Sequence, residues 1–309
     1  MMQADEIKNI AVELGADLVG IAQAEPITMA KERFLKWLKL GYQGELDYLA
    51  KYQAERFDPG NLLSGAKSII SIGVNYYPND NDIAKTKKPY KVAYYAWGDD
   101  YHITLRKILR KLRNGLKRIE PKLNGRICVD TAPFMDVYWA ERAGLGWQGK
   151  HSNLVTTGYG CFINIGALVI DQPVDKYDEP CLNHCGNCTA CIESCPTGAI
   201  IEPYILDATK CISYWTIESK VDTFPPDISK KLNGAVFGCD ICIAACPFGR
   251  FAKLHSAKEY NRHENIELIE TGDVAQLSDA EFTEKYDNSP VSRPGQSGIV
   301  RNIKQNFKK

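Results

Sequence analysis

Most of the eleven cysteines in this 309-residue chain follow a spacing that is typical of iron–sulfur ligands. A first run has the pattern C-x2-C-x2-C-x3-C-P and consists of Cys185, Cys188, Cys191 and Cys195. A second run, also followed by proline, consists of Cys239, Cys242 and Cys246. The second run lacks a fourth member, and Cys211 is the natural replacement. Two runs that each end in Cys-Pro predict two [4Fe-4S] clusters.

The spacing also predicts how the ligands divide between the clusters. In the bacterial ferredoxin pattern, the first three cysteines of a run bind one cluster and the fourth binds the other. One cluster is therefore expected on Cys185, Cys188, Cys191 and Cys246. The other is expected on Cys195, Cys211, Cys239 and Cys242. Structural zinc is the alternative, but zinc sites are usually built from separated pairs of ligands.

Three cysteines remain outside these sets. Cys128 and Cys161 lie in apolar strand patterns and are expected to be buried thiols. Cys181 precedes the first run by four residues, but that run is already complete without it.

Composition places the chain among soluble globular proteins. Hydrophobic residues make up 44% and charged residues 25%, and the length allows two domains. No apolar segment is long enough for a membrane span, and the start of the chain reads as a charged amphipathic helix rather than a signal peptide. We therefore expect a cytoplasmic protein without a membrane partner, in a reducing compartment where cysteines bind metal more readily than they form disulfides.

Basic residues are concentrated in two places although the net charge is zero. Between Tyr101 and Arg126, Lys and Arg are frequent and Glu120 is the single acid, while leucines recur at helical spacing. This pattern predicts an amphipathic helix with a basic face. Arg301 to Lys309 forms a smaller cluster. A solvated surface explains both clusters as well as a nucleic-acid contact does.

The order of predicted elements indicates an α+β protein with three parts. Residues 1–174 read as a mixed α/β domain, with buried strands expected over 68–76 and 161–170. The Asp- and Pro-rich loop 171–180 is the best boundary, so residues 175–251 form the predicted ferredoxin-like two-cluster domain. The polar segment 252–309 is expected to pack on the rest without a core of its own.

A glycine-rich segment, Gly144 to Gly149, matches the dinucleotide fingerprint G-x-G-x-x-G. That fingerprint requires a strand before the glycines and a helix after them. Here a helix is expected before them, over 134–143, and a strand or loop after them, so nicotinamide binding is rejected. The glycines could instead allow the backbone to approach a large, flat ligand.

Asp130 lies at a predicted turn from strand to helix, in the sequence VDTAP. Because Pro133 suits a first helical turn, Asp130 or Thr131 could simply cap the helix. Alternatively, the nearby glycine-rich loop with Lys150 and Asn153 suggests an acid aimed at a bound ligand. The residues alone leave both interpretations open.

Taken together, these motifs resemble those of the epoxyqueuosine reductase family over nearly the whole chain. The motifs are ERFDP around Arg56, YAWGDDYH within 94–102, VDTAP at 129–133, AERAGLGWQGKHSNL at 140–154, CGNCTACIESCPTGAI at 185–200, CISYWTIE at 211–218 and FGCDICIAACPF at 237–248. The resemblance implies reduction of epoxyqueuosine to queuosine at the wobble position of tRNA. It also implies two [4Fe-4S] clusters, a cobalamin in the N-terminal domain and an external low-potential electron donor.

The resemblance further assigns site residues. It makes Asp130 the proton donor, and for that task its pKa is expected to be raised by burial. The residues implied to contact cobalamin are Arg56, Asp130, Lys150, Asn153, Leu154, Ser213 and Asp240. Basic residues of 101–126 and of the C-terminal tail are candidates for contacts with tRNA phosphates.

The chain ends before the C-terminal helical-repeat domain of longer family members, so a short form is expected. Two alternatives remain. A cobalamin-dependent reductive dehalogenase has the same cofactors, but such enzymes typically carry an export signal that is not seen here. A non-catalytic iron–sulfur electron carrier would leave some 170 N-terminal residues unexplained.

Overall fold

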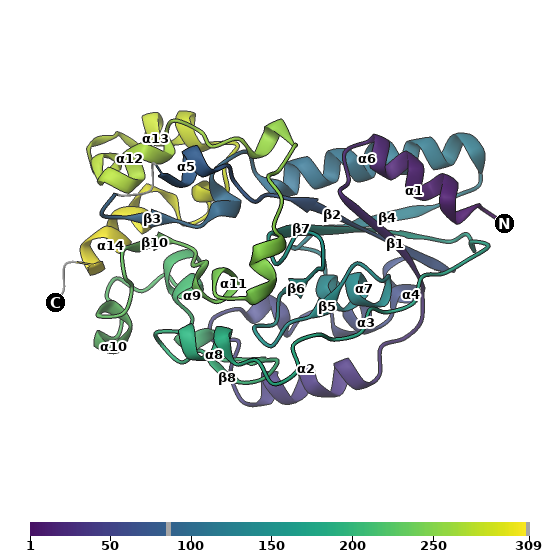
Figure 1. Ribbon diagram of the computed structural model, residues 1–309, viewed down its shortest axis with the longest axis horizontal. Helices are drawn as coiled ribbons and strands as arrows, with labels where there is room; N and C mark the ends of the chain where they lie inside the picture. The colour runs from purple at the N-terminus through teal and green to yellow at the C-terminus, as the bar shows by residue number, and fades with distance from the viewer. Residues whose placement is uncertain (85–87, 307–309) are drawn as a thin grey trace.

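A four-stranded antiparallel sheet organises the N-terminal part of the computed structural model, which describes residues 1–84 and 88–306 (Figure 1). The strand order is β1 (Leu18–Gln23), β2 (Ser68–Asn75), β7 (Ile163–Ile170) and β4 (Gly125–Cys128). β2 pairs with β7 along its whole length, from Ser68 opposite Ile170 to Asn75 opposite Ile163. The strands predicted over 68–76 and 161–170 are thus the two central strands of this sheet.

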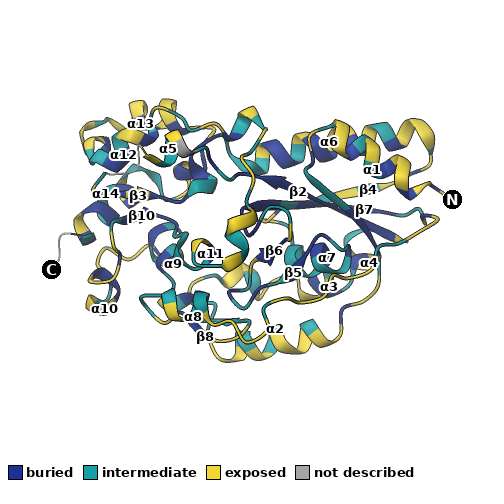
Figure 2. Ribbon diagram, viewed as in Figure 1, coloured by how far each residue is buried: buried dark blue, intermediate teal, exposed yellow. Residues whose placement is uncertain are grey.

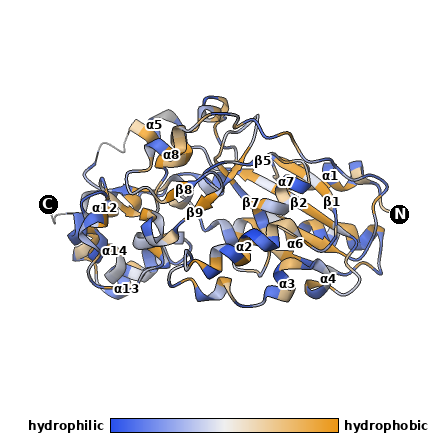
Figure 3. Cartoon of the chain, turned by 90° about the horizontal axis from the view of Figure 1, so that it is seen from below, coloured by the Kyte–Doolittle hydropathy of each residue, from blue (hydrophilic) through white to orange (hydrophobic). Residues whose placement is uncertain are grey.

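Helices cover both faces of the sheet. Because successive side chains of a strand point to opposite faces, Ile70 and Ile72 of β2 pack with α1 (Ala4–Glu13) and α6 (Tyr101–Ile119). Ile69 packs on the other face, in a cluster with residues of α7 (Asp136–Arg142). The two central strands, β2 and β7, are therefore buried along nearly their whole length, whereas α2 (Met29–Lys39) has no buried residue (Figures 2 and 3).

The predicted basic helix is present as α6. Its leucines at 105, 109, 112 and 116 are buried against the sheet, and Asp100 caps its N-terminus by accepting a hydrogen bond from the backbone N–H of His102. The cap places Tyr101 and His102 in the first helical turn. That turn lies beside the site described below.

The cysteine-rich segment has short elements. Cys195 is the C-cap residue of α8 (Ala190–Ser194), and Cys211 is the N-cap residue of α9 (Ile212–Ile217). α11 (Ile241–Ala244) packs against α8. A hairpin of β8 (Ile200–Glu202) and β9 (Ile205–Leu206) connects α8 to α9.

The C-terminal segment 252–309 shares a hydrophobic core with two earlier parts of the chain. Ile266, Ile269, Phe282 and Ile299 are buried in one cluster with residues of 90–97 and 235–237. The N-terminal and cysteine-rich parts each supply one strand to this core, β3 (Lys91–Val92) and β10 (Ala235–Phe237), which pair in parallel. The sequence pattern missed this core because its members lie far apart in the chain.

The remaining elements are short helices and strands: α3 (Gln53–Phe57), α4 (Pro59–Leu62), α5 (Asp80–Ala84), α10 (Pro226–Ser229), α12 (Ile266–Thr271), α13 (Asp279–Tyr286), α14 (Gly295–Asn306), β5 (Trp147–Gln148) and β6 (Leu154–Val155). Within the described residues, no helix combines the length and apolar character needed to cross a bilayer.

Candidate functional site

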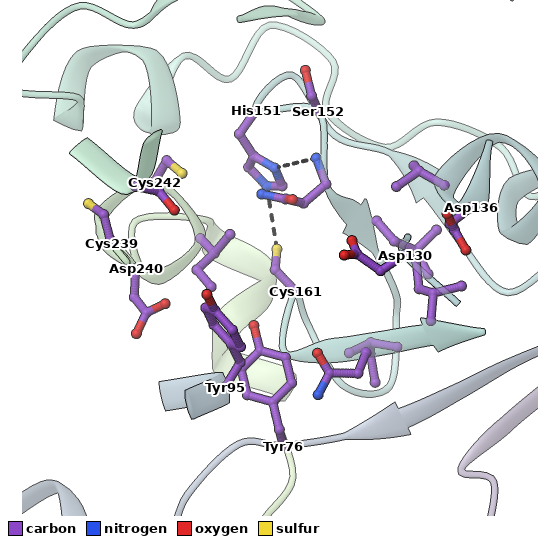
Figure 4. A pocket seen from close by; sticks show the side chains of 18 of the residues that line it. Tyr76, Tyr95, Asp130, Asp136, His151, Ser152, Cys161, Cys239, Asp240 and Cys242 are labelled. Carbon is purple, nitrogen blue, oxygen red and sulfur yellow. Dashed lines mark hydrogen bonds between the residues drawn. The ribbon is translucent and has the colours of Figure 1, made fainter. Parts of the chain in front are cut away.

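A cavity of about 430 Å³ lies between the sheet and the cysteine-rich segment. In Figure 4, Asp130 and Asp136 lie on one side of it and Cys239, Asp240 and Cys242 on the other. Tyr76 and Tyr95 line it as well. The cavity therefore joins a wall with two carboxyl groups to a wall with predicted cluster ligands.

Most of the residues implied to contact cobalamin lie on this cavity. Its lining includes Asp130, Asn153, Leu154, Ser213 and Asp240. They come from the loop after β4, from the β5–β6 connection and the first residue of β6, from α9 and from the residue before α11. Burial raises the pKa of Asp240 to about 6, and its carboxylate accepts a hydrogen bond from the backbone N–H of Tyr94 (2.8 Å).

Arg56 and Lys150 are not among the lining residues. The buried Arg56 guanidinium donates a hydrogen bond to the carbonyl oxygen of Phe134 (3.3 Å), so it lies under the loop that carries Asp130. Lys150 Nζ donates to the carbonyl oxygens of Gly186 (2.7 Å) and Cys188 (2.9 Å). Both side chains support segments next to the cavity, and their contact with a cofactor stays a prediction.

Asp130 does not cap a helix. α7 begins only at Asp136, with Met135 as its N-cap residue, so the capping interpretation of Asp130 and Thr131 is wrong. Asp130 instead has a positive φ of 46° in the loop after β4, a conformation that few non-glycine residues adopt. Its side chain is 55% exposed. This backbone conformation presents the carboxylate to the cavity, where solvent reaches it.

His102 holds the Asp130 carboxylate and was missed by the sequence analysis. Its Nε2 lies 3.1 Å from Asp130 Oδ2, and its Nδ1 lies 2.8 Å from Asp100 Oδ1. The ring stacks on Tyr101, with ring centroids 4.2 Å apart. The one local signal was Asp100, whose capping position places His102 in the first turn of the predicted helix.

The pKa of Asp130 shifts in the direction opposite to the one expected. Burial acts to raise it, but hydrogen bonds from His102 and Tyr101 and the charge of His102 outweigh burial, so the pKa lies below its ordinary value. For His102, partial burial acts to lower the pKa. The hydrogen bonds and charges of Asp100 and Asp130 prevail and raise it to about 9. At neutral pH the pair therefore consists of a carboxylate and an imidazolium.

A second carboxyl group on the cavity wall, Asp136, has the raised pKa that was expected of Asp130. Burial is the larger cause and the negative charge of Asp130 the next, and together they raise the pKa of Asp136 to about 7. Its Oδ1 is buried and has no hydrogen-bond partner among residues 1–84 and 88–306. Sequence reasoning passed over Asp136 because it stands inside an apparent helix.

The cysteines gather as the spacing predicts. Burial raises the pKa of Cys191, and three neighbouring thiols raise it further: Cys246, Cys185 and Cys188. Burial likewise raises the pKa of Cys242, and its neighbouring thiols are Cys211, Cys239 and Cys195. These two groups coincide with the two predicted ligand sets. Cys211, Cys239 and Cys242 also line the cavity, so the second set is the one next to it.

Two further contacts lie near the first cysteine group. Trp147 Nε1 donates a hydrogen bond to Cys185 Sγ (3.4 Å). His151, Cys161 and Cys246 bring one ring nitrogen and two sulfurs within 4.8 Å of one another. Cys161 is buried as expected, and so is Cys128, whereas Cys181 is exposed and donates to the carbonyl oxygen of Gly144 (3.1 Å).

The glycine-rich segment serves packing within the protein. It follows α7 and leads into β5, the reverse of a dinucleotide-binding turn. A Cβ atom at Gly146 would lie 2.1 Å from the carbonyl oxygen of Val155, and one at Gly144 would lie 2.8 Å from that of Glu179. These glycines permit close approach to neighbouring backbone, so the expectation of approach to a flat ligand is wrong for them.

The two basic clusters differ in what their side chains do. On α6, Arg110, Lys111, Lys117 and Arg118 are exposed. In the tail, the Arg301 guanidinium donates to the carbonyl oxygens of Ser219 (2.7 Å) and Val221 (3.1 Å), so it fastens α14 to the cysteine-rich part. Residues 307–309 of the predicted tail cluster lie outside the described residues.

Two segments of the chain, one in the N-terminal part and one in the cysteine-rich part, match known protein families. Residues 56–131 match the family described as Epoxyqueuosine reductase QueG, DUF1730, and residues 184–249 match the 4Fe-4S double cluster binding domain. The epoxyqueuosine reductase of Cellulophaga algicola is 40% identical over 300 residues, which cover 97% of this chain and 96% of the relative. That of Escherichia coli is 36% identical over 303 residues, 97% of this chain and 79% of the relative.

Solved structures agree. An epoxyqueuosine reductase crystallised with an epoxyqueuosine-modified tRNA-Tyr stem loop superposes with a TM-score of 0.87 at 28% identity, covering 98% of this chain and 80% of that one. The Bacillus subtilis enzyme, with the catalytic loop of an aspartate swung out of the active site, superposes with a TM-score of 0.85 at 27% identity, with the same coverage. A catabolic reductive dehalogenase, at 16% identity and a TM-score of 0.50, shares the fold alone.

Proposed function

This chain belongs to the epoxyqueuosine reductase family of oxidoreductases, and we propose that it reduces epoxyqueuosine in tRNA to queuosine with the cavity as its active site. The observation that carries the proposal is the joining, in one cavity, of the Asp130 carboxylate and the thiols of Cys211, Cys239 and Cys242. Reduction of an epoxide needs a source of electrons and a source of protons. The wall with the cysteines can supply the electrons, and the wall with Asp130 can supply a proton.

The cysteine groups are proposed to hold two [4Fe-4S] clusters. Cys185, Cys188, Cys191 and Cys246 bind the outer cluster, and Cys195, Cys211, Cys239 and Cys242 bind the cluster beside the cavity. The matching of residues 184–249 to a double-cluster domain supports this assignment. Electrons from an external low-potential donor thus have an ordered path toward the cavity.

Cobalamin is proposed as the group that the cavity binds. The wall suits a polar, partly exposed ligand, because Asp136 Oδ1 is buried there without a partner among the described residues, and Asn153 and Ser213 offer further polar atoms. When bound, cobalamin supplies a strongly reducing cobalt centre that carries out the difficult electron chemistry. Asp240 and Leu154 are proposed to position it from opposite sides of the cavity.

Residues of the protein are proposed to donate the proton that the reaction needs. Asp130 stands on the exposed side of the cavity, where a base splayed out of a single-stranded anticodon loop can enter. Its carboxyl group passes a proton to the oxygen that leaves the ring. Since hydrogen bonds keep Asp130 ionised at rest, a proton has to reach Asp130 from solvent or from a neighbouring group before it can be passed on.

The test is Asp130→Asn in the holoenzyme, assayed without oxygen on tRNA carrying epoxyqueuosine. Asn keeps the size and hydrogen-bonding capacity of Asp but has no comparably acidic proton. Iron and cobalamin content should stay at the wild-type level, while turnover falls by roughly 10²- to 10⁴-fold. Near-normal turnover would remove Asp130 from the chemistry. Failure of the wild-type protein to reduce the tRNA would overturn the proposed function itself.

A further inference from the structure

We propose that His102 is the proton store of this site: bridging Asp100 and Asp130, it passes a proton to Asp130 during each turnover. This inference rests on the proposed function and adds a residue to it. His102 touches neither the reacting atoms nor the cofactor as proposed, so it acts through Asp130.

The geometry is that of a relay. An imidazole ring has one nitrogen on each side, so it can be held at one nitrogen while it exchanges a proton at the other. Asp100 Oδ1 lies 2.8 Å from Nδ1, and Asp130 Oδ2 lies 3.1 Å from Nε2. Asp100 is itself fixed, because the same oxygen caps α6 through the backbone N–H of His102 (2.8 Å). Stacking on Tyr101 fixes the plane of the ring.

The reaction consumes protons, which His102 is placed to supply through Asp130. When an epoxide becomes an alkene, both C–O bonds break, the oxygen leaves as water, and two electrons and two protons are consumed. The clusters deliver the electrons in the proposed function. Asp130 can hold one proton at most, and it is a carboxylate at rest. A proton that Asp130 passes on must therefore first reach it from solvent or from a hydrogen-bonded donor, and His102 is hydrogen-bonded to it and is cationic at neutral pH.

Other groups that face the pair set its titration. The charged and titratable groups that act on Asp130, His102 or Asp100 include Tyr48, Tyr95, Tyr101, Arg106, Asp136 and Arg293. Arg293 is already paired with Glu218 (2.7 Å), and the pKa of Asp136 is itself raised. The His102 ring is protonated below about pH 9 and neutral above it. His102 therefore loses the proton that it would donate to Asp130 as the pH rises through that value.

The experiment uses three holoenzyme variants assayed between pH 6 and 10. His102→Gln can still donate a hydrogen bond to Asp130 but carries no transferable proton, so it separates orientation from proton supply. Asp100→Asn keeps an equally good helix cap and removes the charge that supports the imidazolium. The matched control is His263→Gln, since His263 also pairs with an aspartate, Asp99 (3.0 Å), away from the cavity lining.

We expect His102→Gln to retain iron and cobalamin, to lose about 10²-fold in turnover and to lose the fall in rate near pH 9. Asp100→Asn should move that fall to lower pH, and His263→Gln should match the wild type. In NMR titrations, the His102 ring of the wild type should titrate near 9, and in Asp130→Asn closer to the ordinary 6.5.

Wild-type turnover and an unchanged pH profile in His102→Gln, alongside an inactive Asp130→Asn, would overturn the relay and leave the proposed function standing. A His102 ring that titrates near 6.5 in the wild type would also overturn it. If the wild-type protein reduces no epoxyqueuosine at all, the proposed function is wrong, and the proposed role of His102 is wrong with it.

Discussion

Lys150 Nζ lies 2.7 Å from the carbonyl oxygen of Gly186, and this contact ties a loop at the cavity to the first cysteine loop. Lys150 belongs to the connection between β5 and β6, whose residues from His151 to Asn153 line the cavity. Gly186, at a positive φ of 45°, lies directly after Cys185. The shape of the cavity and that of the outer cysteine loop are thus coupled through one ammonium group.

The first prediction follows from that contact. Lys150→Ala removes hydrogen bonds to two carbonyl oxygens, each worth about 1 kcal/mol, so the outer cysteine loop should loosen and iron should be lost more quickly to a chelator. Cobalamin retention should change little. The exposed Lys117→Ala on α6 is the control and should behave like the wild type. If cobalamin is lost from Lys150→Ala while iron stays, Lys150 contacts the cofactor as the family resemblance implies.

The second prediction concerns the solitary cysteine. Replacement of Cys211 by Ala should lower the iron content from about eight to about four atoms per chain, because the cluster beside the cavity loses a ligand. Cys181→Ala should keep full iron, since that thiol is exposed and bonded to the carbonyl oxygen of Gly144. Iron and sulfide analysis of protein purified without oxygen measures both. The reverse outcome would move the ligand from Cys211 to Cys181.

Sequence periodicity predicted the elements whose side chains follow one simple pattern. β2 is buried along its whole length because both of its faces are covered, and the leucines of α6 recur because a single face is buried. The double-cluster domain was predictable because cluster geometry restricts the spacing of the ligands.

Features that depend on contacts between distant residues were not predictable in this way. His102 meets Asp130 across 28 positions, and nothing in either local sequence signals that contact. The positive φ of Asp130 and the start of α7 at Asp136 are likewise not apparent from the sequence VDTAP. The expected direction of the Asp130 pKa shift was wrong for the same reason, because the hydrogen-bond donors that lower this pKa, His102 and Tyr101, lie far from Asp130 in the sequence.

The third prediction separates structure from RNA binding in the C-terminal tail. Arg301→Ala leaves the carbonyl oxygens of Ser219 and Val221 without their donor and exposes the ring of Phe224, which the guanidinium covers at 5.0 Å. We expect a loss of about 1–3 kcal/mol in the free energy of unfolding and unchanged tRNA affinity of the folded fraction. Arg110→Ala, an exposed arginine of α6, should leave the melting temperature unchanged. Weaker tRNA binding by a fully stable Arg301→Ala protein would contradict this role.

The last prediction tests the second carboxyl group, Asp136, through the pH dependence of stability. Its pKa is raised to about 7 in the folded protein, above the ordinary 3.8, mainly because of burial. The stability that its protonated form contributes is therefore fully present below about pH 4 and is lost as the pH rises through about 7.

The variant Asp136→Asn has a neutral side chain at every pH and therefore does not lose this stability as the pH rises. Its melting temperature should exceed that of the wild type by a few degrees at pH 8, and the difference should vanish near pH 4. Asp240 is left unchanged in both proteins, so its own titration near 6 cancels in the comparison. A difference that is the same at pH 4 and pH 8 would show that Asp136 does not change its protonation state in this range.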